Sequence, residues 1–160
     1  AVSWQVTQGS AQLSAATTPT VGGNAQVLAT LGGAAGGVTI EASAAVPSGS
    51  PQSFSATARA LPTAIVILVI NTRFNPALDT VAIGGTVTWD WPVGSAQHNV
   101  ISTGSPSFTS FPSTYPADST QFDGPLTYGP LTFNSGGTYR FYCTDHGTPT
   151  SGMRGSVVVR

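Results

Sequence analysis

Charged side chains are scarce in this 160-residue chain. It contains no lysine, five arginines and six acidic residues, which give a formal net charge of −1 at pH 7. Nucleic-acid-binding proteins carry clustered cations, and proteins that bind anionic membranes carry a polybasic face. The composition therefore argues against both nucleic acid and membrane surfaces as partners.

Long apolar runs are also missing. The longest covers residues 64–70, whereas a membrane-spanning helix needs about 20 apolar residues. We expect no membrane insertion and interpret this run as a strand buried on both faces. The chain shows no signal-peptide pattern at its start. The absence of lysine and the many small polar residues favour an extracytoplasmic (periplasmic, cell-surface or secreted) location.

Sulfur and imidazole groups are few, but they are concentrated. The only cysteine, Cys143, the only methionine, Met153, and one of two histidines, His146, fall within a stretch of about eleven residues, and the other histidine is His98. A thiolate, two imidazoles and a weak thioether form the donor set of a blue-copper electron-transfer site. Zinc is the rival metal, but closed zinc sites use several Cys and His rather than Met. The sequence therefore predicts one copper ion at these four residues.

The spacing of the donors sets local requirements. His146 can reach the same ion as Cys143 only if the chain turns tightly after the cysteine, which Gly147 permits. Gly152 allows the backbone to pass closely where Met153 returns. His98 must come from another strand that ends at the same pole of the fold.

The histidine count also limits catalysis. With both histidines in one site, none is left for the second copper centre of a multicopper oxidase or a copper nitrite reductase. A serine or cysteine hydrolase would lack its general base for the same reason. We therefore expect an electron-transfer protein with no catalytic reaction of its own.

Alternation of apolar and polar residues at period two, with frequent Gly and Pro turns, predicts an all-β protein. We divide the chain into a domain at residues 1–58, a linker at 59–63 and a domain at 64–160. No pattern assigns residues 103–130. The expected strands of the second domain are residues 64–70, 80–83, 86–91, 99–102, 131–133, 138–143 and 155–159.

Alternation also predicts which side chains face the core of the second domain. Trp89 and Trp91 share one face of their strand, so we interpret them as core residues rather than electron relays. Cys143 shares a face with two aromatic residues at the end of its strand. Arg140 and Arg154 are interpreted as solvated surface residues.

Residues 1–58 resemble the C-terminal part of a bacterial immunoglobulin-like domain of the invasin and intimin kind. The earlier strands of such a domain are missing, which implies an incomplete sandwich with a bare edge and apolar face. We expect a second chain, giving a homo-oligomer, or the second domain to cover it. The resemblance is carried by Val2-Ser3-Trp4-Gln5-Val6-Thr7, Gly23-Asn24-Ala25-Gln26-Val27, Gly37-Val38-Thr39-Ile40-Glu41-Ala42 and Phe54-Ser55-Ala56-Thr57-Ala58.

Residues 64–160 resemble a cupredoxin of the plastocyanin and halocyanin type, which implies a Greek-key β-sandwich or barrel. The family's copper ligands fall on His98, Cys143, His146 and Met153. Two features depart from plastocyanins: a longer loop before the methionine, and Asp145 where they carry proline. The resemblance is carried by Gly84-Gly85-Thr86-Val87-Thr88-Trp89, Gln97-His98-Asn99-Val100, Gly137-Thr138-Tyr139-Arg140-Phe141-Tyr142-Cys143 and Gly152-Met153-Arg154-Gly155-Ser156-Val157-Val158-Val159.

The resemblance further implies neighbours that tune the site. The backbone N–H of Asn99 is expected to point at the Cys143 sulfur. Asp145, unlike proline, has an N–H that can offer a second hydrogen bond. Its carboxylate is expected to point to solvent.

These features predict a one-electron carrier that exchanges electrons with redox protein partners through the exposed edge of His146. The alternative is a copper-binding module of a larger cell-surface or adhesive protein, in which copper is structural, sensory or stored.

Overall fold

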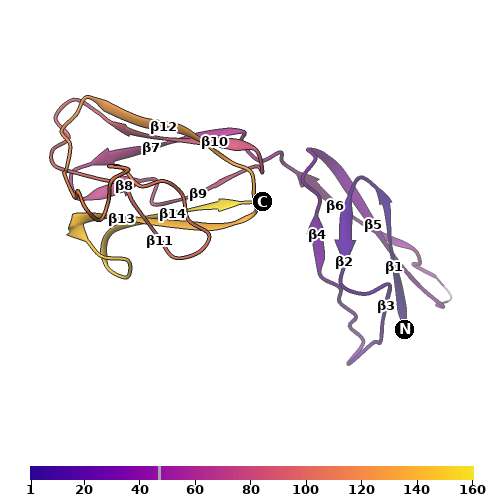
Figure 1. Ribbon diagram of the computed structural model, residues 1–160. Helices are drawn as coiled ribbons and strands as arrows, with labels where there is room; N and C mark the ends of the chain where they lie inside the picture. Colours follow the sequence, from indigo (N-terminus) through magenta and orange to yellow (C-terminus); the bar gives the residue numbers. More distant parts are fainter. Residues whose placement is uncertain (47) are drawn as a thin grey trace. The chain divides into compact units, whose positions relative to one another are not determined.

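The computed structural model describes residues 1–46 and 48–160, and all regular elements in these ranges are β-strands (Figure 1). The described ranges contain no helix long and apolar enough to cross a membrane. The chain forms two compact units, Ala1–Ala60 (unit 1) and Leu61–Arg160 (unit 2).

Unit 1 contains one four-stranded antiparallel sheet, in the order β3-β1-β5-β6, and a separate pair, β2-β4. Unit 1 therefore has no second four-stranded sheet among its described residues. The strands are β1 (Val2–Gln8), β2 (Ala11–Leu13), β3 (Thr17–Thr18), β4 (Ala29–Leu31), β5 (Gly36–Ala44) and β6 (Gln52–Ala58).

The core of unit 1 is thin. Among its described residues, only Val38 and Ala58 are buried hydrophobic side chains. The Trp4 ring lies 6.4 Å from the Phe54 ring, yet Phe54 remains 55% exposed. Alternation along β1 and β5 therefore produces an apolar sheet face that is only partly covered.

Unit 2 is a sandwich of two four-stranded sheets, β12-β10-β7-β8 and β11-β13-β14-β9. Each sheet contains one parallel pair, β7 with β10 and β9 with β14. The strands are β7 (Ala64–Ile70), β8 (Arg73–Asn75), β9 (Leu78–Val81), β10 (Gly85–Trp91), β11 (Ile101–Thr103), β12 (Leu126–Phe133), β13 (Gly137–Gly147) and β14 (Gly152–Val159).

One hydrophobic core joins the two sheets of unit 2. Trp89 from β10 meets Phe141 from β13 edge to face, with ring centroids 5.4 Å apart. Trp89 and Trp91 are both fully buried, as the alternation predicted. Cys143 lies in the same core, on the inward face of β13 that also carries Tyr139 and Phe141.

Some strand predictions were wrong in detail. The run at 64–70 is not buried on both faces, because Val66 is 55% exposed while Ile65, Ile67 and Val69 are buried. The strand predicted at 80–83 ends at Val81, and the one predicted at 131–133 begins earlier, at Leu126. A sandwich sheet has a solvent-facing side, so even an uninterrupted apolar run can expose every second residue.

The unassigned segment 103–130 contains the end of β11 and the start of β12, and the residues between these strands, 104–125, are called the strap. Its backbone pairs with the segment before β11 through two isolated bridges, His98 with Phe122 and Val100 with Phe111. The predicted strand at 99–102 is therefore divided: its first part pairs only with the strap, and the regular strand β11 begins at Ile101. The strap encloses His98, which is 1% exposed.

Candidate metal centre

The structure brings the sulfur of Cys143 and both imidazoles together. The Sγ atom lies 3.8 Å from Nδ1 of His98 and 3.8 Å from Nδ1 of His146. The ligand atoms of all three residues lie within 4.8 Å of one another. Cys143 and His146, both from β13, thus meet His98, which lies 45 positions before the cysteine.

This separation fits a metal ion in a trigonal plane. Metal bonds of about 2.0 Å to imidazole nitrogen and about 2.3 Å to thiolate sulfur, at about 120° to each other, place the two donor atoms about 3.7 Å apart. The observed 3.8 Å agrees with that value. Both histidines also present the same nitrogen, Nδ1, to the sulfur, so the donor set converges without any rearrangement of the rings.

A bulge in the β13–β14 ladder gives the site its shape. Tyr142 pairs with Arg154 and Gly147 pairs with Gly152, and the register shifts between these pairs. Residues 143–146 of β13 therefore oppose Met153 alone on β14. Bulges redirect side chains, and this one lets two side chains of the same strand, Cys143 and His146, turn toward one point.

Of the two glycines at this bulge, Gly152 has the role predicted for it, whereas Gly147 has a different one. The turn after the cysteine is made by the bulge and not by Gly147. A Cβ at Gly147 would lie 2.6 Å from the backbone N and O of Met153, so the residue provides room for the opposite strand. Gly152 has a φ of +71°, and its Cβ would meet the carbonyl oxygen of His146. The structure agrees with the close backbone approach predicted there.

Met153 is 2% exposed and belongs to the same core cluster as Cys143. Its backbone lies against Gly147 on the opposite strand. Together with His98, Cys143 and His146, this buried methionine forms an arrangement like that of a type 1 copper site.

Burial controls the protonation of His98. Loss of solvent, and secondarily repulsion from His146, lower the pKa of His98 below its usual value. Its Nε2 atom is buried and makes no hydrogen bond of good geometry, although the nearby backbone of Asn71 partly opposes the fall in pKa. A neutral imidazole has a free lone pair for a metal ion, so the environment of His98 favours its ligating form.

The side chain of Asn99 forms hydrogen bonds to β13, the strand that carries Cys143. Its Oδ1 accepts a hydrogen bond from the backbone N–H of Thr144 (2.9 Å), and its Nδ2 donates to the Thr144 hydroxyl (2.8 Å). Two strap groups complete the contact: the Gln121 amide donates to the same hydroxyl (3.0 Å), and the Ser119 carbonyl accepts from Asn99 (3.2 Å). Sequence reasoning missed this clamp, because the strap has no periodic pattern that would point to Gln121.

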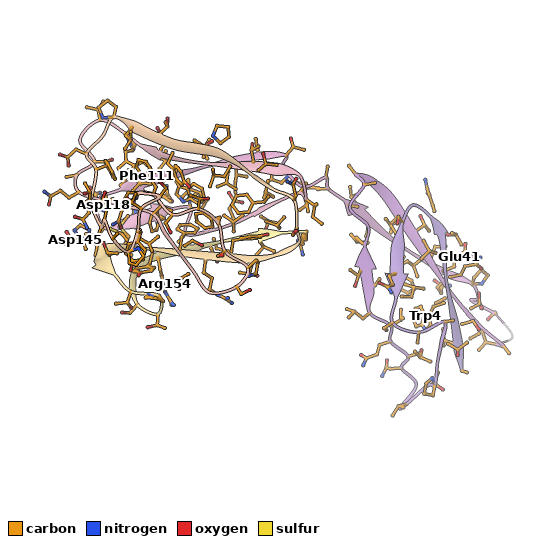
Figure 2. The ribbon with its side chains drawn as sticks, viewed as in Figure 1. Trp4, Glu41, Phe111, Asp118, Asp145 and Arg154 are labelled. Carbon is orange, nitrogen blue, oxygen red and sulfur yellow. The ribbon has the colours of Figure 1, made fainter. Side chains whose placement is uncertain are left out.

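His146 is the exposed member of the site. Its side chain is 30% exposed, whereas Cys143 is fully buried. The Asp145 carboxylate is 51% exposed, but it does not point only to solvent, because its Oδ2 lies 3.7 Å from Nε2 of His146. Figure 2 shows Asp145 at the end of unit 2. The backbone hydrogen bonds from Asn99 and Asp145 to the sulfur remain predictions.

Comparison with known families identifies unit 2. Residues 69–160 match the model of copper-binding proteins of the plastocyanin/azurin family. The chain belongs to this family. Its members bind copper, and the donor set of this plastocyanin/azurin family protein fits that metal by geometry and by chemistry. A comparison with curated protein sequences found no match.

Solved structures similar to the chain include an amicyanin variant in its oxidised state, with 28% identity over 61% of this chain and 83% of that one, at a TM-score of 0.45. A purple cupredoxin from Nitrosopumilus maritimus has 20% identity over 59% and 98% of the two chains, at a TM-score of 0.44. A copper-containing nitrite reductase from Thermus scotoductus SA-01 has 20% identity over 66% of this chain but 24% of its own, at a TM-score of 0.43.

Proposed function

We propose that this protein is a type 1 blue copper protein that transfers single electrons between redox protein partners. It would hold one copper ion with His98, Cys143, His146 and Met153. The observation that carries the proposal is the pair of 3.8 Å separations from one buried sulfur to two Nδ1 atoms.

When bound, copper supplies one-electron chemistry by alternating between Cu(II) and Cu(I). The residues of the site hold the donor atoms in a fixed geometry. The Asn99 clamp fixes the backbone after Cys143, and the bulge fixes His146 relative to Met153. Burial of the sulfur excludes water, while the exposed edge of His146 is the nearest donor side chain to an approaching partner. Such a site supports electron exchange without bond-making chemistry.

The direct test is to add Cu(II) to the apoprotein and record the visible spectrum, followed by cyclic voltammetry. We expect an intense blue charge-transfer band at one copper per chain and a fast reversible couple. A chain that binds copper without that band would contradict the type 1 assignment.

Replacing Met153 with leucine is expected to keep the blue colour and raise the reduction potential. Leucine fills a similar volume but removes a weak axial donor, which disfavours Cu(II). Voltammetry of the copper-loaded variant measures the change, and its visible spectrum serves as the control for an intact thiolate bond. An unchanged potential would show that the thioether is not a donor.

Substitutions at Asp145 separate its carboxylate from its backbone N–H. Asp145→Asn removes a negative charge 3.7 Å from His146 Nε2, so it is expected to raise the potential. The effect should be below about 1 kcal/mol and weaken with salt, because the carboxylate is half exposed. Asp145→Pro removes the N–H as well, so its potential should lie below that of the asparagine variant. Equal potentials in the two variants would show that the N–H does not reach the sulfur.

A copper-binding module of a larger cell-surface or adhesive protein is the second candidate. Unit 1 favours this candidate, because it contains no His or Cys and so adds no ligand to the metal centre. Its partly covered sheet offers a surface for a second chain, and the lysine-free composition supports an extracytoplasmic location. A sluggish or absent voltammetric response from a copper-loaded chain would favour this module over a carrier.

A further inference from the structure

Two arginines share a groove on the outer face of the sheet that carries the cysteine. The groove has a volume of about 340 Å³, and its lining includes Ala77, Leu78, Arg140, Pro149, Arg154 and Ser156. Arg140 comes from β13 and Arg154 from β14, and both are exposed. Figure 2 labels Arg154 on this part of unit 2.

The pairing of β13 with β14 determines how far apart the two arginines lie. Arg140 pairs with Ser156, so Arg154 is its diagonal neighbour across the strands. Diagonal neighbours in an antiparallel pair are about 7–8 Å apart, within reach of long side chains. The only ion pair within 4.0 Å in the described ranges joins Asp145 and His146, so neither guanidinium has a carboxylate partner. The two guanidinium groups can therefore approach each other, and an anion bound between them would offset their repulsion.

Apart from the two arginines and Ser156, the groove is lined by apolar residues and glycine, and two of its strands, β13 and β14, carry copper ligands. Leu78 is 64% exposed, and Pro149, in the loop that joins β13 and β14, also lines the groove. Tyr142, which precedes Cys143, pairs with Arg154 across the ladder. Of the residues that line the groove, Arg154 follows Met153 directly and Phe141 lies two positions before Cys143.

We propose that this arginine groove is a docking surface for an acidic patch on a redox protein partner. The inference rests on the proposed electron-transfer function. Guanidinium groups bind carboxylates in a bidentate manner, and the exposed Leu78 offers an apolar contact that a protein surface can fill. A nucleic acid is the poorer fit, since the chain has only five arginines and no basic stripe. Arg140 and Arg154 are exposed, as the sequence predicted, and the proposal adds a docking role to these solvated residues.

Electron-transfer kinetics with small reagents test the charge of the groove. The copper-loaded full chain is reduced by hexacyanoferrate(II), an anion, and separately by hexaammineruthenium(II), a cation. At low ionic strength, Arg140→Gln/Arg154→Gln is expected to slow the anionic reagent at least about fivefold and not the cationic one. The control, Arg59→Gln/Arg160→Gln, removes the same charge outside the groove and should change either rate less than about twofold. Equal slowing in both double variants would overturn the proposal.

A peptide probe tests the groove independently of electron transfer. Adding deca-glutamate to the full chain without copper should shift amide NMR signals of β13 and β14 beside the groove. The shifts should disappear in Arg140→Gln/Arg154→Gln and persist in the control. Shifts that persist in the groove variant, or equal binding of a ten-residue oligothymidylate, would overturn the assignment of an acidic protein partner. Failure of the blue band with intact peptide binding would instead reject the proposed function.

Discussion

Replacing Cys143 with alanine is expected to abolish the blue absorption completely. The band arises from charge transfer between a thiolate and Cu(II), and the chain has no other sulfur that can form a thiolate. Metal ligands bind only in their deprotonated form, and the alanine variant leaves two imidazoles and a thioether. Copper affinity should fall by more than about 100-fold, since even loss of a group behind a ligand costs 10–100-fold. Visible spectroscopy and competition with a chelator measure both effects.

Cys143→Ser is the companion variant, because serine keeps the size of the side chain and fills the buried position. Both variants should keep the far-ultraviolet circular dichroism of the parent, which separates loss of a ligand from loss of the fold. A blue Cys143→Ala protein would contradict the copper assignment.

The second large effect is expected from Gly152→Ala. The position combines a positive φ with a backbone carbonyl, that of His146, in the place of the added methyl group. The loop must shift to accept a Cβ, and His146 and Met153 move with it. We expect copper affinity to fall at least about tenfold and the visible spectrum to change, in addition to about 1–2 kcal/mol of backbone strain. Copper titration and thermal unfolding of the apoprotein measure the two contributions.

Gly104→Ala is the matched control for this variant. Gly104 has a φ of +80°, but no atom lies within 4 Å of an added Cβ. It should therefore show the strain in thermal unfolding without any change in the copper spectrum. If Gly152→Ala binds copper with the parent spectrum and affinity, the close approach of the backbone at Gly152 does not determine the site.

The donor set could be predicted from sequence because rare residue types carry it. Cys143 and Met153 occur once each, and strict alternation placed Cys143 on the inward face with Phe141. Alternation is a local property of a strand, so it survives without knowledge of its neighbours. The bulge was not predictable in the same way, because it depends on how β13 is paired and not on its own residues.

The contributions of the strap could not be predicted at all. Gln121 and Ser119 contact Thr144 and Asn99, the neighbours of two copper ligands, because residues 104–125 pair with the segment that carries His98. Nothing in a run of Pro, Ser, Thr and aromatic residues indicates such pairing. The exposure of Val66 was unpredictable for a similar reason: an apolar run does not reveal whether one or both faces of its strand are covered.

The distribution of the donors along the chain also determines when the site is completed as the protein folds. Cys143, His146 and Met153 belong to one hairpin, whose closure is local and takes microseconds. His98 lies 45 residues before the cysteine, and it is enclosed only when the strap has closed over it. Contacts of such sequence separation form late, since their loop entropy must be overcome first. The last imidazole therefore reaches the other three donors in the step that closes the sandwich, which makes acquisition of the full donor set a folding event of the polypeptide.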